Sequence, residues 1–236
     1  MIIANNVTKK FGRLKALDNV SMTCNKGECI ALVGPNGSGK TTLIKSILGM
    51  VVPDSGFITF NGNNILHHWQ YRSNIGYMPQ IGRYPDNMTI GHVLDMMKDI
   101  RQQSKATDED LIDAFQIRPL YKKRMRTLSG GTRQKVSACI AFLFNPDVLV
   151  LDEPTAGLDP IASEKLKEKI ILEKKKGKLV LITSHVLSEL DDLVTQVIYM
   201  QDGLLRFHKP IEEIHTDTGE KKLAKAIAHY MQHQAL

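Results

Sequence analysis

The sequence predicts an α/β fold: a mostly parallel core sheet with helices on both faces, an N-terminal antiparallel β subdomain and an inserted α-helical subdomain. Two observations predict it. In the second half of the chain, short apolar runs alternate with helix-like stretches, which is typical of a parallel sheet. Earlier, a glycine-rich segment joins an apolar run to a helical stretch, in the strand–loop–helix order of a phosphate-binding loop.

The first 60 residues consist of short strands separated by turns. Residues 2–3, 20–23 and 57–60 are rich in β-formers and are bounded by Gly, Asn and Lys. Residues 28–33 form a buried strand, and the helix that follows over 41–48 ends at Gly49. This region predicts the antiparallel subdomain and the start of the core sheet.

The pattern becomes helical after residue 86. Val93, Leu94, Met97 and Ile100 recur at helical spacing, so we expect a helical subdomain at about 86–145, inserted in the catalytic core. The later elements are a helix over 131–144, a strand over 148–151, a helix over 161–176, a strand over 179–183 and a helix after His185. We expect one domain over 1–215 and a short helical tail over 216–236 that docks on it.

Composition restricts the class of protein. The 236 residues are 42% apolar and 24% charged, and no apolar run approaches the roughly 20 residues that span a bilayer. The N-terminal segment lacks the pattern of a signal peptide, so we expect a cytoplasmic protein. Its three cysteines, Cys24, Cys29 and Cys139, are expected to be reduced and mostly buried.

The net charge of +6 suits an anionic partner such as ATP, a lipid surface or nucleic acid. Basic residues cluster at 122–126 and 174–178, and we interpret both clusters as solvated surface. The adjacent His67 and His68 are not interpreted as metal ligands, because neighbouring residues of a strand point to opposite faces. A solvated loop is the expectation for them.

The segment GPNGSGKTT fits the phosphate-loop pattern without a mismatch. Its glycines let backbone N–H groups surround phosphate oxygens, and the following helix directs its positive dipole end at them. Lys40 is expected to reach the β- and γ-phosphates of ATP, and the Thr41 hydroxyl to bind Mg²⁺. The candidate nucleotide-binding residues here are Gly34, Pro35, Asn36, Gly37, Ser38, Gly39, Lys40, Thr41 and Thr42.

Two acids follow the apolar run VLVL at 148–151. A strand buried on both faces would deliver Asp152 and Glu153 beside the phosphate site. We assign Asp152 to Mg²⁺, and Glu153 to the attacking water as general base.

The segment LSGGTRQK provides a second anion-binding helix N-terminus, at Ser129, Gly130 and Gly131. One chain with one ATP has no use for two helix ends that grip phosphate. A head-to-tail pair of chains would use both helix ends, because each chain would close its LSGG segment over the γ-phosphate held by the other. This segment therefore predicts a dimer.

Together these segments make residues 1 to about 215 resemble the ATP-binding cassette (ABC) ATPases, which are P-loop NTPases. The resemblance implies roles for four more residues. Gln80 is similar to the glutamine that touches Mg²⁺ and the water, and His185 to the switch histidine that contacts the γ-phosphate. Asp159, in AGLD, resembles the loop that crosses the dimer interface, and Phe11 occupies the place of the aromatic that stacks on adenine.

The resemblance further implies an ATP-hydrolysing subunit that works with a separate transmembrane permease, peripheral on the inner face of the membrane and without nucleic acid. Tyr84, Pro85, Met88 and Ile90 are expected contacts for that permease. The run TRQK, with GLDPIAS and SHVLSEL, resembles single-cassette subunits of ABC-2-type exporters, and within them the copper-processing ATPases of nitrous oxide reductase maturation. The alternative is a cassette of a translation or DNA-repair factor; the short insert between Gln80 and Ser129 disfavours it.

Overall fold

The chain leaves its first compact unit after Arg72 and returns to it at Leu179. The computed structural model, which describes residues 1–101 and 107–233 with side chains up to 230, divides into one unit formed by 1–72 and 179–236 and another formed by 73–178. The short 3-10 helix η1 (Gln70–Asn74) spans the boundary. The predicted helical subdomain at 86–145 falls inside the second unit.

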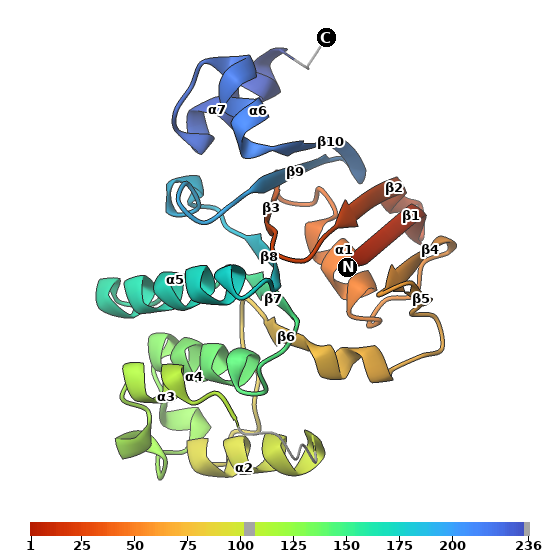
Figure 1. Ribbon diagram of the computed structural model, residues 1–236. Coiled ribbons are helices and arrows are strands. Elements are labelled where there is room, and N and C mark those ends of the chain that lie inside the picture. The colour runs from red at the N-terminus through yellow and green to blue at the C-terminus, as the bar shows by residue number, and fades with distance from the viewer. Residues whose placement is uncertain (102–106, 234–236) are drawn as a thin grey trace. The chain divides into compact units, whose positions relative to one another are not determined.

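An antiparallel sheet forms the N-terminal part of the first unit (Figure 1). Its strands are β1 (Ile2–Phe11), β2 (Leu14–Cys24), β4 (Ser55–Phe60) and β5 (Asn63–Asn64), in the order β2-β1-β4-β5. Apolar side chains of β1 such as Ile2, Ala4 and Val7 are buried. The predicted β subdomain is confirmed, with strands longer than the β-rich segments alone indicated.

The same unit contains a set of buried parallel strands. Strand β3 (Cys29–Val33) lies between β8 (Leu179–Thr183) and β9 (Gln196–Gln201), and is parallel to both. Every residue of β3 and β8 is buried, as expected for strands covered on both faces. Strand β10 (Leu204–Pro210) closes a hairpin with β9 that the sequence analysis did not anticipate.

Helix α1 (Lys40–Ile47) follows β3 and confirms the predicted strand–loop–helix order. Gly49 adopts a left-handed φ of 65° just beyond it, and its N–H donates to the Ser46 carbonyl. This is how glycine ends a helix, because a side chain is disfavoured in that conformation.

The prediction of a helix after His185 is wrong. Only a single 3-10 turn forms there, η4 (Leu187–Glu189). Leu190 and Leu193 are buried and only three positions apart, and their N–H groups bond at i→i−3 spacing to Leu187 and Leu190. The chain must enter β9 at Gln196, so the tighter turn replaces a regular helix.

The tail forms two helices, α6 (Ile211–Thr218) and α7 (Leu223–His233), which lie together beside β10 (Figure 1). Leu223, Ala226 and Ile227 are buried, so the tail docks on its own unit as expected. The side chain of Met231, expected on the same face, lies outside the described residues.

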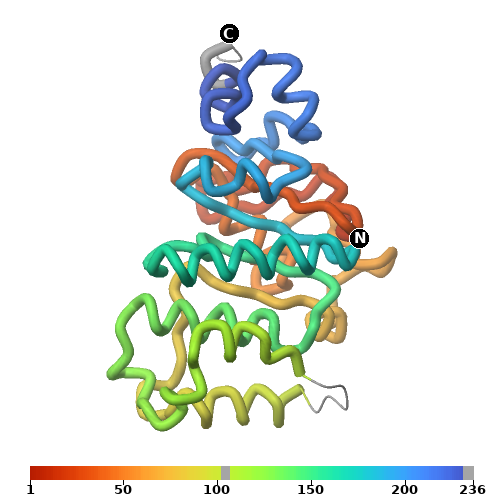
Figure 2. The backbone as a smooth tube through the Cα atoms, turned by 60° about the vertical axis from the view of Figure 1, so that its left-hand side comes forward, coloured from red at the N-terminus to blue at the C-terminus, as the bar shows by residue number. Residues whose placement is uncertain are grey.

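The second unit carries two parallel strands, β6 (Ile75–Met78) and β7 (Val148–Asp152). Its helices are α2 (Ile90–Arg101), α3 (Asp110–Ala114), α4 (Gly130–Phe142) and α5 (Pro160–Lys175), with 3-10 turns η2 (Arg118–Leu120) and η3 (Met125–Thr127). Helix α4 packs on α2, α3 and β6, and the three helices lie side by side in both views (Figures 1 and 2).

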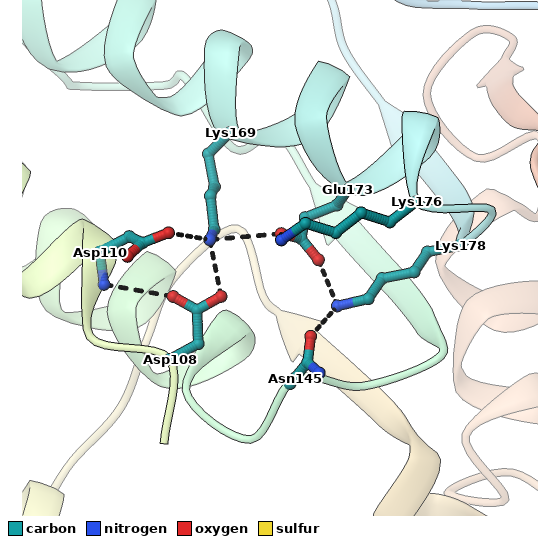
Figure 3. Close-up of polar contacts among 7 residues, drawn as sticks. All are labelled: Asp108, Asp110, Asn145, Lys169, Glu173, Lys176 and Lys178. Atoms are coloured by element: carbon teal, nitrogen blue, oxygen red, sulfur yellow. Dashed lines mark hydrogen bonds and ion pairs between the residues drawn. The ribbon is translucent and has the colours of Figure 1, made fainter. Parts of the chain in front are cut away.

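A buried ion network fixes α5 in this unit (Figure 3). The Lys169 ammonium lies 2.6 Å from an Asp108 carboxylate oxygen, 2.7 Å from Asp110 and 3.2 Å from Glu173. On the other side, Lys176 and Lys178 pair with Glu173, whose side chain is fully buried. The network ties the start of α3 to the end of α5.

This network corrects the interpretation of residues 174–178 as solvated surface for Lys178, whereas Lys175 and Lys176 are exposed as expected. Lys178 is 10% exposed and donates to both Glu173 and Asn145. Burial by itself would raise the pKa of Glu173, but hydrogen bonds from Lys176 and Lys178 and the charge of Lys169 outweigh it and lower the pKa from 4.5 to about 2.

The expectations for the cysteines and for His67 and His68 are confirmed. The three cysteines are buried and free, and burial raises the pKa of the Cys24 thiol to about 12. His67 and His68 are exposed. Among the described helices, none combines the length and hydropathy needed to cross a bilayer.

Glu173→Gln is predicted to lower the free energy of unfolding at pH 7 by about 3 kcal/mol, because it leaves the mostly buried Lys178 ammonium without its anion and removes one of the three carboxylates around buried Lys169. Glu173 is ionised in the folded state at lower pH than in the unfolded state. Its contribution is therefore complete above pH 4.5 and is lost as the pH falls towards about 2. Urea unfolding of both proteins between pH 7 and 3 checks this. A gap between wild type and variant that stays constant over that range would contradict it.

Candidate functional site

The loop between β3 and α1 brings backbone unusually close to neighbouring backbone. A Cβ on Gly34 would lie 2.1 Å from the Met200 carbonyl oxygen, and a Cβ on Gly39 would lie 2.3 Å from that of Ala16. Gly39 also caps α1 with a left-handed φ of 102°. Only glycine fits these positions, so the chain can curl around the free N–H groups at the start of α1.

Two side chains of this loop fit a bound phosphate. The Ser38 hydroxyl is buried and makes no hydrogen bond to any described residue, so a phosphate oxygen would supply its acceptor. The Lys40 ammonium donates to the loop's own carbonyls, at 2.7 Å from Gly34 and 3.0 Å from Pro35. Pro35, Asn36 and Gly37 are exposed at the rim, and Thr41 and Thr42 open α1.

The β9–β10 turn is hydrogen-bonded to this loop. The sequence analysis did not predict that contact. The Gly203 N–H donates to the Ser38 carbonyl at 3.2 Å, and the Gly203 carbonyl accepts from Asp18 of β2 at 2.9 Å. Gly203 has a left-handed φ of 76°, and a Cβ there would lie 2.7 Å from the Lys15 carbonyl. The dipeptide Asp202-Gly203 was the available signal, because it is typical of a hairpin turn.

His185 leaves the sheet at the same edge as this loop. Strands β3 and β8 pair in parallel with Ala31 opposite Ile182, so their carboxyl ends coincide. His185 is exposed, and the preceding Ser184 closes a small turn with Val186 through two hydrogen bonds. The first unit therefore brings two predicted site elements, the phosphate loop and His185, to one edge.

Phe11 stands at the end of β1 with half of its side chain exposed (51%). Across the hairpin, β2 carries Ala16, whose carbonyl approaches Gly39 of the phosphate loop. The Lys9 ammonium lies 5.6 Å from the centre of the Phe11 ring. An exposed aromatic face beside a nucleotide loop is suited to stacking on a base.

In the second unit, Gln80 and the two acids also meet at one sheet edge. Strands β6 and β7 are parallel with Met78 opposite Leu151, so Gln80, just after β6, and Asp152, the last residue of β7, lie at the same edge. Burial and the negative charge of Asp152 raise the pKa of Tyr77 on β6. Glu153 is 8% exposed and has a left-handed φ of 53°, which is rare for a residue with a side chain and is typical of functional positions.

Helix α4 starts as predicted at the LSGG segment, one residue earlier than expected. Ser129 is its N-cap, since its Oγ accepts from the Thr132 N–H at 3.2 Å and lies 2.9 Å from the Thr132 hydroxyl. Ser129 and Gly130 are exposed, and the free N–H groups of the first turn offer an anion site.

Three contacts join this helix to the acids and to the AGLD loop, and the sequence analysis did not anticipate them. Buried Gln134 donates through Nε2 to the Glu153 carbonyl at 3.3 Å. A Cβ on Gly131 would lie 2.6 Å from the Gly157 carbonyl. Lys135 pairs with Asp159 at 2.6 Å.

Asp159 also caps a helix, in addition to the role predicted for it at the dimer interface. Its Oδ1 accepts from the Ala162 N–H at 2.9 Å and so caps α5. The hydrogen bonds from Lys135 and from that N–H lower the pKa of the carboxyl group. The second unit thus holds the LSGG helix, the paired acids and the AGLD loop as one packed group.

Comparison with known proteins identifies relatives over most of the chain. The family described as "ABC transporter" matches residues 17–156. The chain is 32% identical to the lipopolysaccharide export system ATP-binding protein LptB of Haemophilus influenzae, over 94% of this chain and 96% of that one. It is 34% identical to the xylose/arabinose import ATP-binding protein XylG of Sulfolobus acidocaldarius, over 90% and 89%.

Among solved structures, the fold is similar to one described as an ATP-binding subunit of an ABC transporter. The TM-score is 0.90 at 25% sequence identity, over 97% of this chain and 98% of that one. The predicted fold class is confirmed by this agreement.

Gly131→Ala is predicted to destabilise the protein by about 1–3 kcal/mol, because its Cβ would overlap the Gly157 carbonyl and push the LSGG helix from the AGLD loop. Gly130→Ala is the matched control, since no described atom lies within 4 Å of its Cβ. Urea unfolding of the two variants and wild type measures the difference. Equal stabilities of the two variants would contradict the close packing.

Proposed function

The chain belongs to the ABC transporter family as an ATP-binding, ATP-hydrolysing cassette, and we propose that it dimerises on ATP and drives a separate transmembrane permease. The observation that carries the dimer is the second helix N-terminus at Ser129–Gly131. It is exposed, capped by Ser129 and packed through Gly131 against the AGLD loop. A single chain already has one phosphate-binding helix end at α1, so the α4 end serves the ATP of a second copy.

The roles of the site residues follow from their chemistry. The α1 N–H groups, Ser38 and Lys40 hold the phosphates, and Phe11 stacks on adenine. Thr41, Gln80 and Asp152 would hold Mg²⁺ through the oxygen donors that it prefers, and the ion would neutralise charge on the phosphate oxygens.

Glu153 is the general base for the attacking water. Its carboxylate projects from a backbone held in a left-handed conformation, with its carbonyl accepting from Gln134 and from the Ala156 N–H. His185 contacts the γ-phosphate and responds to its loss. Catalysis in such a site is mostly positioning and charge stabilisation.

The permease docks on an apolar pocket of the first unit. A cavity of about 380 Å³ lies between the end of α1, β4 and the segment that follows β5. Trp69 on its rim is 68% exposed, and Phe57 and Leu66 beside it are also exposed. Of the described residues lining it, none is acidic, whereas Arg72, His67 and His68 can carry positive charge. A helix with an apolar anchor beside a carboxylate would fit.

The predicted contacts near Gln80 belong to the second unit and are partly corrected. Tyr84 lines a cavity of about 280 Å³ with Arg83, Asp86 and Arg133, and Pro85 is exposed. Met88 is half-buried. Ile90 is fully buried at the start of α2, so it is a core residue and offers no contact surface.

Export is the direction we favour, because TRQK, GLDPIAS and SHVLSEL resemble subunits of ABC-2-type exporters and LptB is named for export. XylG is named for import, so the family alone does not give the direction. The resemblance to the copper-processing ATPases of nitrous oxide reductase maturation suggests a copper or sulfur species as the cargo. The protein would act on the inner face of the membrane, bound to its permease.

Glu153→Gln is predicted to lower ATP turnover at least a hundredfold while leaving an ATP-bound dimer, because the amide cannot accept the proton of the attacking water. Size-exclusion chromatography with ATP and a phosphate-release assay measure the two effects. Lys40→Ala is the control: it removes the phosphate-binding ammonium and should give neither turnover nor dimer. Near-normal turnover by Glu153→Gln would overturn the assignment of the base.

Trp69→Glu is predicted to reduce co-purification of the membrane subunit at least fivefold, because a carboxylate replaces the exposed apolar ring at the pocket rim. ATP binding by the isolated chain should not change. Affinity purification from detergent-solubilised membranes compares the variant with wild type. Co-purification of ribosomes or DNA in place of a membrane protein would support the non-transport alternative and contradict the permease assignment.

A further inference from the structure

The C-terminal helix α7 packs directly on the segment that follows His185. It contacts the 3-10 turn η4, whose first residue, Leu187, lies two positions after the histidine. Leu190, Leu193 and Val194, which follow η4 in this segment, are all buried. So are Leu223, Ala226 and Ile227 of α7. The tail is therefore part of the surroundings of His185 rather than an independent appendage.

A hydrogen bond fixes the register of this contact. The Asp191 carboxylate accepts from the Leu223 N–H at 2.8 Å, although the two residues are 32 positions apart. Leu223 is the first residue of α7, where backbone N–H groups have no partner inside the helix. A carboxylate at this end also interacts favourably with the helix dipole. Asp191 thus acts as a cap supplied from the segment after His185.

The opposite part of α7 is anchored to β10 and α6. The Tyr230 ring packs on Phe207 with centroids 4.9 Å apart, and the Lys209 ammonium lies 5.5 Å from its centre. The Tyr230 hydroxyl donates to Asp217, which also pairs with Lys209 at 3.0 Å. These contacts hold α7 in place, so that Asp191 is bound to a fixed element.

His185 is consequently held between two supports. On one side, β8 ends at Thr183 inside the buried sheet. On the other, the chain is bound to α7 through Asp191 and the contact at η4. The intervening turn is short and closed by Ser184, and the His185 side chain itself is exposed. Loss of the second support would remove the contacts that fix the chain on the carboxyl side of His185.

We propose that Asp191 is a positioning residue for His185, and that helix α7 thereby sets the rate of ATP hydrolysis. This inference rests on the proposed role of His185 at the γ-phosphate. Nucleotide binding would not depend on it, because the phosphate loop is supported by β2 and by the β9–β10 turn. The expected signature is a change in kcat without a change in ATP affinity.

The first test compares Asp191→Ala with Asp192→Ala in the full chain. Both remove one carboxylate, but Asp192 is exposed and Asp191 holds α7. Asp191→Ala should lower kcat about tenfold with the KM for ATP within twofold of wild type, and Asp192→Ala should leave both within twofold. Asp191→Asn, which keeps an oxygen acceptor, should recover most of the loss. Turnover is expressed per titrated ATP-binding site, so an unfolded fraction does not enter it.

The second test separates positioning from general destabilisation. In a His185→Ala background, Asp191→Ala should cause no further loss of kcat, because the group that it positions is gone. The same tenfold fall in that background would overturn the proposal, as would an Asp191→Ala enzyme with wild-type kcat. If His185→Ala alone turned over ATP normally, the proposed role of His185 would fail instead, which is a distinguishable result.

Discussion

Parallel pairing of buried strands is the constraint on which the rest of this structure depends. Strands β3 and β8 are buried along their whole length, and so is β7 up to Asp152. Such strands expose chemistry only where they end, and parallel partners end at the same edge. That geometry places the phosphate loop with His185 in the first unit, and Gln80 with the two acids in the second.

Close backbone packing is the second requirement, and glycine meets it at specific places. Gly34 and Gly39 sit where a Cβ would overlap the carbonyls of Met200 and Ala16, and Gly131 does the same against Gly157. In each case a loop that handles phosphate, or is proposed to, is supported by the backbone of another segment. The support is rigid because it involves main-chain atoms, which cannot rotate away.

Ion pairs, one largely buried and one partly exposed, connect the helices around these sites. In the second unit, Lys169 joins α5 to Asp108 and Asp110 before and within α3, and Lys135 joins α4 to Asp159 at the start of α5. Helix α5 is thus held by ion pairs at its first turn and along its second half. The AGLD loop immediately precedes it, so the position of that loop follows from the position of the helix.

The sequence by itself determined which chemistry the protein can carry. Glycines, a lysine and a threonine in one spacing predict a phosphate loop, an apolar run ending in two acids predicts the strand proposed to carry the catalytic residues, and period-2 and period-3.6 patterns predict the fold class. These are local properties, and local sequence encodes them. Tertiary structure alone decided that Gln134 bonds to the Glu153 carbonyl, that Lys178 joins an ion network with most of its side chain covered, and that the segment after His185 is a single turn bound to α7. Asp191 and Leu223 are 32 residues apart, and no local pattern specifies such a contact, because it exists only after folding has brought the two segments together.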